Sequence, residues 1–541
     1  MPLLMALCVI VGIVVGTFFA NHFSSNRLNI INSGSNRLNN LLHIIDDQYV
    51  DKVNIDSLVE EAMPQILSDL DPHSVYISAK DVQIATDDLK GSFSGVGIEF
   101  VIREDTVRVQ GVIKNGPAER AGLLAGDKIV TIDDSLFVGS IVTNEEAMHR
   151  LKGPKDTKVK IGVLRFGEKN IKQFVVTRGE IITHSVTSTY MVDDRTGYIR
   201  IKSFGENTYP ELLIALASLQ QKGFKNLIID LRDNTGGYLM SAVQIANEFL
   251  PSNRLITYTQ GRKAPREDFK SDGRGSYQDI PLIVLINEAS ASASEILAGA
   301  IQDNDRGTVI GRRSFGKGLV QKQIDFSDGS MIRLTVARYY SPSGRCIQKP
   351  YTMGDNKDYE EDLLMRYTHG EFFSQDSIKH EGPEYHTSIG RVVYGGGGIT
   401  PDIFVPDDTL GITSYYKQAA MSGLILQFAF NYTDENRQTL NNYSKMTQLS
   451  DYLVKQNTVE KFAAYADKHG LQRRNLMIQK SHRLLQRYIN SRIIYNILDE
   501  DAWIQYLNLE DPVIKMAIDV FNKGNAFPIR LEASATDKGK R

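Results

Sequence analysis

Residues 282–303 have the sequence LIVLINEASASASEILAGAIQD, and this stretch decides the fold of the chain. The uninterrupted apolar run Leu282–Ile286 predicts a strand that is buried on both faces. Ser292 and Glu295 have the spacing of a capping box, which predicts a helix over Ser292–Asp303. A buried strand followed by a helix is typical of an α/β core with a partly parallel sheet.

The same alternation of strand and helix extends outward over residues 195–340. A Ser-Asp-Gly turn at Ser327–Gly329 then predicts a hairpin between two further strands. The expected strands are Tyr198–Phe204, Leu227–Leu231, Val320–Phe326 and Met331–Arg338, and the expected helices are Pro210–Lys222 and Tyr238–Leu250.

The flanking regions have different patterns. Residues 25–88 and 410–530 carry apolar residues at helical spacing, whereas residues 89–178 contain short alternating strands and glycine turns. We therefore expect an α/β, multi-domain (α+β) chain with a mixed-sheet core. Its expected parts are an anchor (1–24), a helical region (25–88), a small β domain (89–178), the core (179–408), and a helical extension with a polar tail (409–541).

Composition excludes several classes of protein. Of 541 residues, 42% are apolar, which excludes wholesale disorder and a polytopic membrane protein. The 62 Lys and Arg against 65 Asp and Glu give a net charge of −3, so nucleic acid is not an expected partner. The two cysteines, Cys8 and Cys346, form neither a disulfide framework nor a cysteine-based zinc site.

Leu3–Ala20 is an apolar run of eighteen residues without a charge. This length is at the short end for a membrane span and exceeds most signal-peptide cores. The run ends in Thr17, Phe18, Phe19 and Ala20, which make a poor cleavage site. A buried core helix is the alternative, but nothing polar interrupts the run. We expect an uncleaved anchor in the inner membrane, with the rest of the chain in the periplasm or extracytoplasmic space.

Two motif-like segments point to cofactors that we do not expect. Gly311–Lys317 matches the start of a phosphate-binding loop, but Gly318 replaces the hydroxyl that holds magnesium, and a strand is expected next. His380 and His386 resemble half of a zinc site, yet Gly382-Pro383 prevents the helix that would align them. No metal and no other cofactor is therefore expected.

Ser292 and Lys317 are the candidate catalytic residues. Ser292 lies at the carboxyl end of a strand and at a helix N-terminus, where free N–H groups suit a developing oxyanion. Taken alone, Ser292 is better explained as a helix cap and Lys317 as a solvated turn residue. A lysine becomes a general base when burial lowers its pKa, and Gly316 and Gly318 allow the close backbone approach that burial requires.

Taken together, the motifs resemble the C-terminal processing peptidases (tail-specific proteases), which are serine–lysine peptidases with a PDZ domain. The resemblance covers roughly residues 40–406. The matching motifs are SDLDPHS (68–74), FSGVGI (93–98), GPA (116–118), AGL (121–123), GD (126–127), DLRDNTGG (230–237), SASASE (290–295), GKGLVQ (316–321) and GGGGITPD (395–402).

The resemblance implies a role for each catalytic residue. Ser292, rather than Ser290 or Ser294, is the implied nucleophile, and Lys317 is the implied base. Gln321 is implied to orient the lysine. The implied oxyanion donors are the backbone N–H of Ala293 and a second N–H from the turn at Gly236-Gly237.

Residues 89–178 carry the expected peptide-binding site. The glycine-punctuated segment Gly95–Ile98 (Gly95, Val96, Gly97, Ile98) enters a strand, and its successive N–H groups suit a terminal carboxylate. A helix that opens with a capping box at Thr143 should flank the groove, where His149 either contacts a ligand side chain or faces solvent.

The sequence thus predicts a serine endopeptidase that cleaves proteins near free C-termini. A catalytically idle PDZ scaffold that binds protein tails is the alternative, and an ATP-driven machine is disfavoured by the incomplete phosphate loop. The expected partners are protein or peptide substrates with free C-termini and the membrane. The oligomeric state is open, with a homo-oligomer as one option.

Overall fold

The computed structural model describes residues 34–528 except 104, 166–167 and 381. The chain divides into two compact units, Met1–Leu70 and Asp71–Arg541. Leu3–Ala20, the expected anchor, lies outside the described residues. Within the described part of the chain, no helix combines the length and the apolar character needed to cross a bilayer.

The described part of the first unit consists of two helices, α2 (Gly34–Gln48) and α3 (Ile55–Ser68). Asn54 caps α3, because its side-chain oxygen accepts the N–H of Ser57 at 3.3 Å. The second unit begins with the short strand β1 (Val75–Ile77) and helix α4 (Val82–Lys90). The helical prediction for residues 25–88 is confirmed for three helices and wrong at β1.

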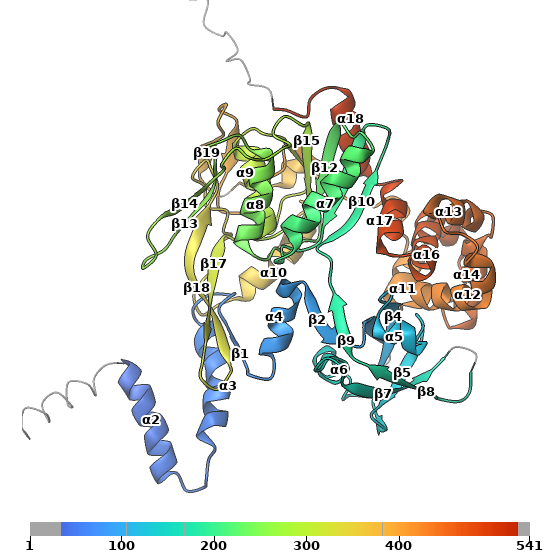
Figure 1. The fold of residues 1–541 in the computed structure, drawn as a ribbon, viewed down its shortest axis with the longest axis horizontal. Helices are drawn as coiled ribbons and strands as arrows, with labels where there is room; N and C mark the ends of the chain where they lie inside the picture. Colours follow the sequence, from blue (N-terminus) through green and yellow to red (C-terminus); the bar gives the residue numbers. More distant parts are fainter. Residues whose placement is uncertain (1–33, 104, 166–167, 381, 529–541) are drawn as a thin grey trace, which may run out of the picture. The chain divides into compact units, whose positions relative to one another are not determined.

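The second unit is built on a six-stranded sheet with the order β10-β11-β12-β15-β16-β21 (Figure 1). All pairs from β11 onward are parallel, and β10 is antiparallel to β11. The strands are β10 (Val186–Met191), β11 (Thr196–Ile201), β12 (Asn226–Asp230), β15 (Leu282–Ile286), β16 (Thr308–Gly311) and β21 (Ile403–Phe404). The helices that alternate with them are α7 (Thr208–Gln221), α8 (Leu239–Phe249) and α9 (Ala293–Asp303), as the sequence predicted.

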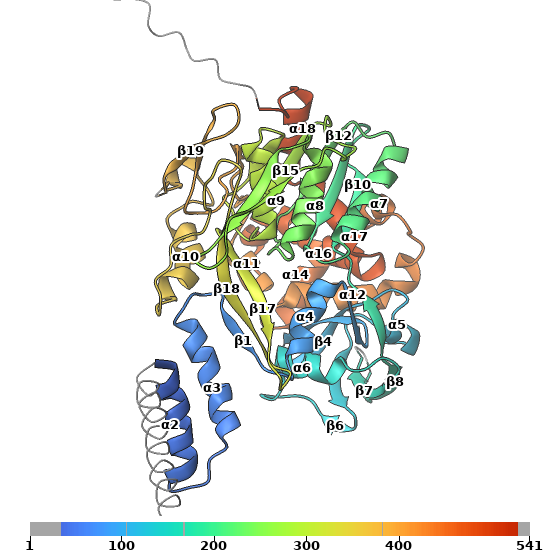
Figure 2. The ribbon, with the colours of Figure 1, turned by 60° about the vertical axis from the view of Figure 1, so that its left-hand side comes forward.

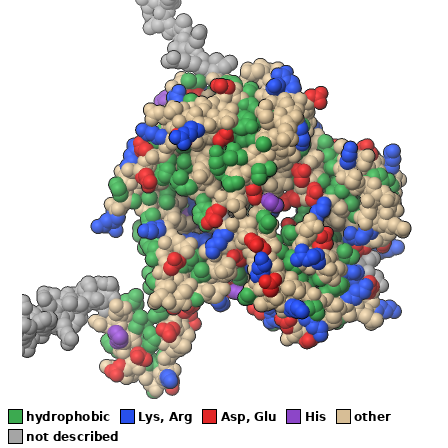
Figure 3. Space-filling model, viewed as in Figure 1, with side chains coloured by type: hydrophobic (Ala, Val, Ile, Leu, Met, Phe, Trp, Pro, Cys, Tyr) green, Lys and Arg blue, Asp and Glu red, His purple; other side chains and the backbone are tan. Residues whose placement is uncertain are grey.

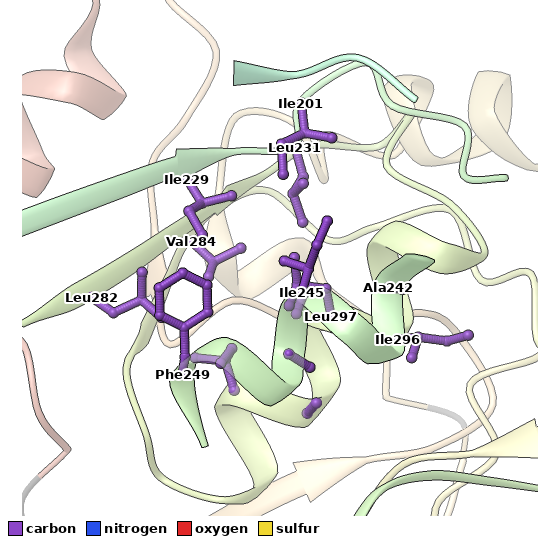
Figure 4. Packing of buried hydrophobic residues seen from close by; sticks show 14 of the residues in the cluster. Ile201, Ile229, Leu231, Ala242, Ile245, Phe249, Leu282, Val284, Ile296 and Leu297 are labelled. Atoms are coloured by element: carbon purple, nitrogen blue, oxygen red, sulfur yellow. The ribbon is translucent and has the colours of Figure 1, made fainter. Parts of the chain in front are cut away.

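Alternate residues of the central strands pack against opposite layers. Ile229 and Val284 belong to a core shared with α7, α8 and α9, where Phe249 is fully buried (Figure 4). Ile228 and Ile283 instead pack with residues of the C-terminal helices α17 (Glu500–Asn508) and α18 (Pro512–Asn522). This period of two explains why Leu227–Ile229 of β12 and all of β15 are apolar on both faces.

A second sheet lies next to the first and has the order β1-β18-β13-β14, with β17 also paired to β18 (Figure 2). Its strands are β13 (Leu255–Gln260), β14 (Glu267–Lys270), β17 (Leu319–Asp325) and β18 (Met331–Tyr340). The hairpin predicted around Ser327–Gly329 is confirmed. Because β1 pairs with β18 (Val75 opposite Arg333), the residues just before β1 lie beside this hairpin.

Residues 92–182 form a separate β domain. Its larger sheet has the order β3-β4-β5-β7-β8, with β6 paired to β5, and β2 pairs with β9. The strands are β2 (Ser92–Gly95), β3 (Ile98–Arg103), β4 (Thr106–Val112), β5 (Lys128–Ile132), β6 (Ser135–Leu136), β7 (Lys158–Leu164), β8 (Lys172–Thr177) and β9 (Gly179–Ile182), and the helices are α5 (Pro117–Ala121) and α6 (Asn144–Leu151). The predicted cap of α6 is present, since Thr143 accepts the N–H of Glu146 at 3.1 Å.

The remaining elements complete the chain. A segment after β18 holds α10 (Lys357–Thr368), the 3-10 turn η1 (Gln375–Ser377), β19 (Glu384–His386) and β20 (Val392–Tyr394). The predicted helical extension comprises α11 (Ser414–Met421), α12 (Leu424–Leu440), α13 (Met446–Val454), α14 (Thr458–Lys468), α15 (Asn475–Lys480), α16 (His482–Ile497), α17 and α18. Charged side chains of both signs are interspersed on the face shown in Figure 3.

Candidate active site

One large cavity contains both candidate catalytic residues. Its volume is about 1350 Å³, and Ser292, Lys317 and Gln321 all line it, together with the turn at Gly236-Gly237. Residues from the β domain, the core and the C-terminal helices contribute to its wall, including Ile113, Leu239, Ile296, Tyr339 and Glu500. The structure therefore brings together the predicted catalytic-site residues, of which Gly236 and Gln321 are 85 positions apart in the sequence.

Ser292 is the N-cap of α9 and has a strained backbone. Its φ of 55° lies in the left-handed region, which costs a residue other than glycine about 1–3 kcal/mol. The backbone is held by four contacts. Its N–H donates to Glu295 Oε2 at 2.8 Å, and its carbonyl accepts from the N–H groups of Glu295 (2.9 Å) and Ile296 (3.0 Å) and from the Tyr339 hydroxyl (3.1 Å). The predicted capping box is present. The strained conformation places Ser292 in a sharp turn between the strand and the helix.

The turn at Gly236-Gly237 lies directly against Ser292. A Cβ on Gly236 would lie 2.7 Å from the Cβ of Ser292 and 3.0 Å from the N of Ala293, so only glycine fits there. Asn234 holds this turn, because its Oδ1 accepts the N–H of Gly236 at 2.8 Å. The expectation that the N–H of Gly236 is an oxyanion donor is therefore corrected, because that N–H already donates to Asn234. The N–H of Gly237 is the remaining candidate donor in this turn.

Lys317 lies in the loop between β16 and β17. Its ammonium donates to Gln321 Oε1 at 3.3 Å, as the sequence predicted. The β17–β18 ladder has a register shift between Val320 and Gln321, just before the glutamine that contacts the lysine. Burial lowers the pKa of Lys317 below its ordinary value of 10.5, and the Arg333 guanidinium lowers it further, against the opposing effect of Glu295 and Asp71.

Gln321 is itself held by a loop that sequence reasoning treated only as a matching motif. Its side-chain N–H donates to the backbone oxygen of His73. Asp71 fixes that loop, because it accepts the N–H groups of His73 (2.9 Å) and Ser74 (3.0 Å) and the hydroxyl of Thr335 on β18 (3.0 Å). The Asp-x-His-Ser spacing is typical of an Asx turn, a signal that marks the loop but not its distant partner.

His73 lies near Lys317 and has an uncharged imidazole. Its Nε2 lies 2.6 Å from the hydroxyl of Tyr359 on α10. Burial and, to a smaller extent, the positive charge of nearby Lys317 lower the pKa of His73 to about 4. The imidazole is therefore uncharged at neutral pH and contributes no second base of ordinary strength.

The loop around Lys317 does not resemble a phosphate-binding site. Lys317 is followed by strand β17, as the sequence predicted, and not by the helix that follows a phosphate-binding loop. The backbone of the loop contacts the GGGGITPD motif, because the N–H of Ser314 donates to the carbonyl of Ile399 at 3.0 Å.

The segment Gly95–Ile98 connects β2 to the edge strand β3. Gly95, Val96 and Gly97 are buried, and Ile98 is half-buried. The carbonyls of Val96 and Gly97 accept N–H groups from Ala118 (2.8 Å) and Ile113 (3.0 Å), which fixes the loop on the segment that carries α5.

His149 on α6 has neither of the surroundings expected for it. The ring is half-buried, and Nε2 lies 3.0 Å from Asp81 Oδ1 at the start of α4. Lys152, which follows α6, pairs with Asp87 on α4 at 3.0 Å. These two contacts join the β domain to the beginning of the core.

A strained serine at a helix N-terminus shares its cavity with a half-buried lysine of lowered pKa. These features are typical of a serine-type peptidase. Family models agree: peptidase family S41 matches residues 195–360, a PDZ domain matches residues 94–176, and a family of unknown function matches residues 415–499.

Several individual proteins are also similar to this chain. The carboxy-terminal-processing protease of Bartonella bacilliformis is 38% identical over 58% of this chain and 72% of its own length. The carboxy-terminal processing protease CtpA of Bacillus subtilis is 33% identical over 60% and 69%. A solved photosystem II D1 C-terminal processing protease is 26% identical over 68% of this chain and 92% of its own, with a TM-score of 0.36. The chain belongs to the carboxy-terminal processing proteases of peptidase family S41.

Proposed function

We propose that this serine peptidase cleaves proteins near their C-termini, with Ser292 as the nucleophile and Lys317 as the general base. The observation that carries the proposal is the shared cavity, in which the strained serine and a lysine of lowered pKa both take part. Gln321 supports it, because its Oε1 accepts a hydrogen bond from the lysine Nζ. A neutral lysine accepts a proton, whereas an ammonium does not.

In the proposed acylation step, Ser292 Oγ attacks the scissile carbonyl carbon while its proton moves to Lys317 Nζ. The carbonyl oxygen gains the negative charge and lies against the backbone N–H groups of Ala293, the first residue of α9, and Gly237. When the tetrahedral intermediate collapses, the C–N bond breaks and the ammonium of Lys317 protonates the leaving amine. An ester of Ser292 remains.

Deacylation reverses the same proton path. Lys317 Nζ takes a proton from a water molecule, which attacks the ester carbonyl, and then returns the proton to Ser292 Oγ. A fluorophosphonate probe tests the nucleophile directly, because it forms a stable adduct with an activated serine. We expect peptide mapping of the labelled chain to place the adduct on Ser292; an adduct elsewhere would contradict the assignment.

We further propose that Gly95–Ile98 captures the substrate's terminal carboxylate. The fixed loop and the edge position of β3 suit a peptide that adds as a strand. We expect that amidating the C-terminus of a substrate weakens recognition by roughly 1.5–3 kcal/mol, because the loop N–H groups lose a charge-assisted hydrogen bond. Competition between free-acid and amidated tails measures this; equal cleavage of the two would remove the loop from recognition.

We also propose that Leu3–Ala20 anchors the chain in the inner membrane, with the catalytic part on the periplasmic or extracytoplasmic side. The full chain is expected to partition with membranes, whereas a chain that begins near Ser25 is expected to be soluble without detergent. Membrane fractionation measures the partitioning, and N-terminal sequencing shows whether the mature chain keeps Leu3–Ala20. A mature protein that begins after residue 20 would exclude an uncleaved anchor.

A further inference from the structure

One buried carboxylate contacts the backbones of both catalytic residues. Glu295 Oε2 accepts the N–H of Ser292 at 2.8 Å and the N–H of Lys317 at 2.9 Å. Its Oε1 accepts the N–H of Gly316 at 2.7 Å and the hydroxyl of Ser314 at 2.5 Å. The residue is only 2% exposed, so these four donors replace water as partners of the carboxylate.

A tyrosine hydroxyl makes a second link between the same two residues. The Tyr339 hydroxyl on β18 lies within hydrogen-bond distance of the carbonyl of Ser292, at 3.1 Å, and of the carbonyl of Lys317. Glu295 thus contacts the two N–H groups and Tyr339 the two carbonyl groups. Ser292 and Lys317 belong to different segments, and these side chains join their peptide units directly.

We propose that Glu295 and Tyr339 are positioning residues that fix the separation of nucleophile and base and hold Ser292 in its strained conformation. This inference rests on the proposed roles of Ser292 and Lys317. Neither side chain takes the proton in the reaction. An ionised carboxylate can accept all four donors, whereas an amide presents one oxygen and two donors of its own.

The charge of Glu295 makes the proposal testable by a pH profile, which a purely structural role would not change. Ionised Glu295 raises the pKa of Lys317, so its loss should lower that pKa further. The carboxyl itself is buried, and burial raises the pKa of Glu295 to about 7 against the four hydrogen bonds that lower it. The titratable groups that face Glu295 are Lys317 before β17, Tyr339 on β18, Cys346 and Lys349 after β18, and Tyr359 on α10.

The test measures kcat, KM and the pH profile of kcat/KM for the purified full chain in detergent, with a chromogenic peptide. Glu295→Gln should lower kcat about 100-fold, as a misplacement of catalytic groups does, with KM within threefold of wild type. In the pH profile of kcat/KM for Glu295→Gln, the acid limb should move to lower pH, because Lys317 loses a neighbouring negative charge. Tyr339→Phe should lower kcat roughly tenfold for one lost hydrogen bond, without moving the acid limb.

Matched variants separate positioning from general loss of structure. Glu288→Gln removes a neighbouring glutamate that pairs with Arg312 at 2.8 Å, and Tyr209→Phe removes a hydroxyl that donates to Glu248 at 3.0 Å. Neither contact involves Ser292 or Lys317, so both variants should keep kcat within threefold of wild type. Tyr339→Phe conserves volume and keeps the test open if Glu295→Gln does not fold.

The outcomes distinguish this inference from the proposed function. Labelling of Ser292 by a fluorophosphonate in the wild-type chain would support the proposed function. If labelling is slowed in Glu295→Gln and Tyr339→Phe by the same factor as kcat, the positioning role is supported as well. Wild-type labelling at Ser292 with unchanged rates in a folded Glu295→Gln chain would overturn the positioning role alone. An unchanged kcat in Tyr339→Phe would overturn the part of the proposal that concerns the tyrosine. Labelling at another residue would overturn the proposed function itself.

Discussion

Lys317→Arg is expected to abolish proteolysis, with a loss of roughly 10⁴-fold or more in kcat, although the charge at this position is kept. The guanidinium is effectively never deprotonated, so it cannot accept the serine proton. Lys317 lines the cavity, and burial lowers its pKa, so the neutral form that can act as a base is more accessible than for an exposed lysine. Initial rates on an unfolded protein substrate measure the loss.

Two further variants and a pH profile test the same base. Lys317→Ala should be equally inactive, whereas Gln321→Ala should be milder, because it disturbs only the orientation of the lysine. For wild type, kcat/KM should rise with pH, since the neutral lysine is the active form, and the midpoint should lie below 10.5. Near wild-type activity of Lys317→Arg would mean that a different residue is the base.

Ser292→Ala is expected to remove turnover by roughly 10⁴–10⁶-fold, because no other group forms the acyl-enzyme. The chain should still fold, since alanine at a helix cap costs only about 0.5–2 kcal/mol. Rates and thermal unfolding of the purified variant give the two quantities separately.

Ser294→Ala is the matched control for the nucleophile. Ser294 is buried two residues further on, and its hydroxyl donates to the backbone oxygen of Asn234 at 2.8 Å. Its loss should cost about 1 kcal/mol of stability and leave the chemistry intact. A Ser292→Ala enzyme that stays active while Ser294→Ala is inactive would transfer the nucleophile's role to Ser294.

The sequence predicts those parts of the fold that local pattern determines. Leu282–Ile286 is a strand with the predicted bounds, and the predicted helix over Ser292–Asp303 is α9 with Ser292 as its cap. An apolar run bounded by turns and a capping box are local signals, because the residues that create them are adjacent in the chain. The contact between Lys317 and Gln321, in contrast, was implied by the family resemblance and not by a local pattern.

Features that depend on distant partners were not predictable from the sequence. β1 is three residues long, and it forms because it pairs with β18, where Val75 lies opposite Arg333, 258 positions downstream. The C-terminal helices were expected as an extension, yet Ile514 of α18 packs against the core sheet. The partner of the Gly236 N–H is a side-chain oxygen two residues away, and only the conformation of the turn decides it.

The most direct test of the central claim is digestion of an unfolded protein of known sequence by the purified chain, with products identified by intact mass. We expect products that keep the substrate's N-terminus and have lost residues from its C-terminus, and none of these products with Ser292→Ala or Lys317→Arg. The same truncated products from the Ser292→Ala chain would show that Ser292 is not the nucleophile.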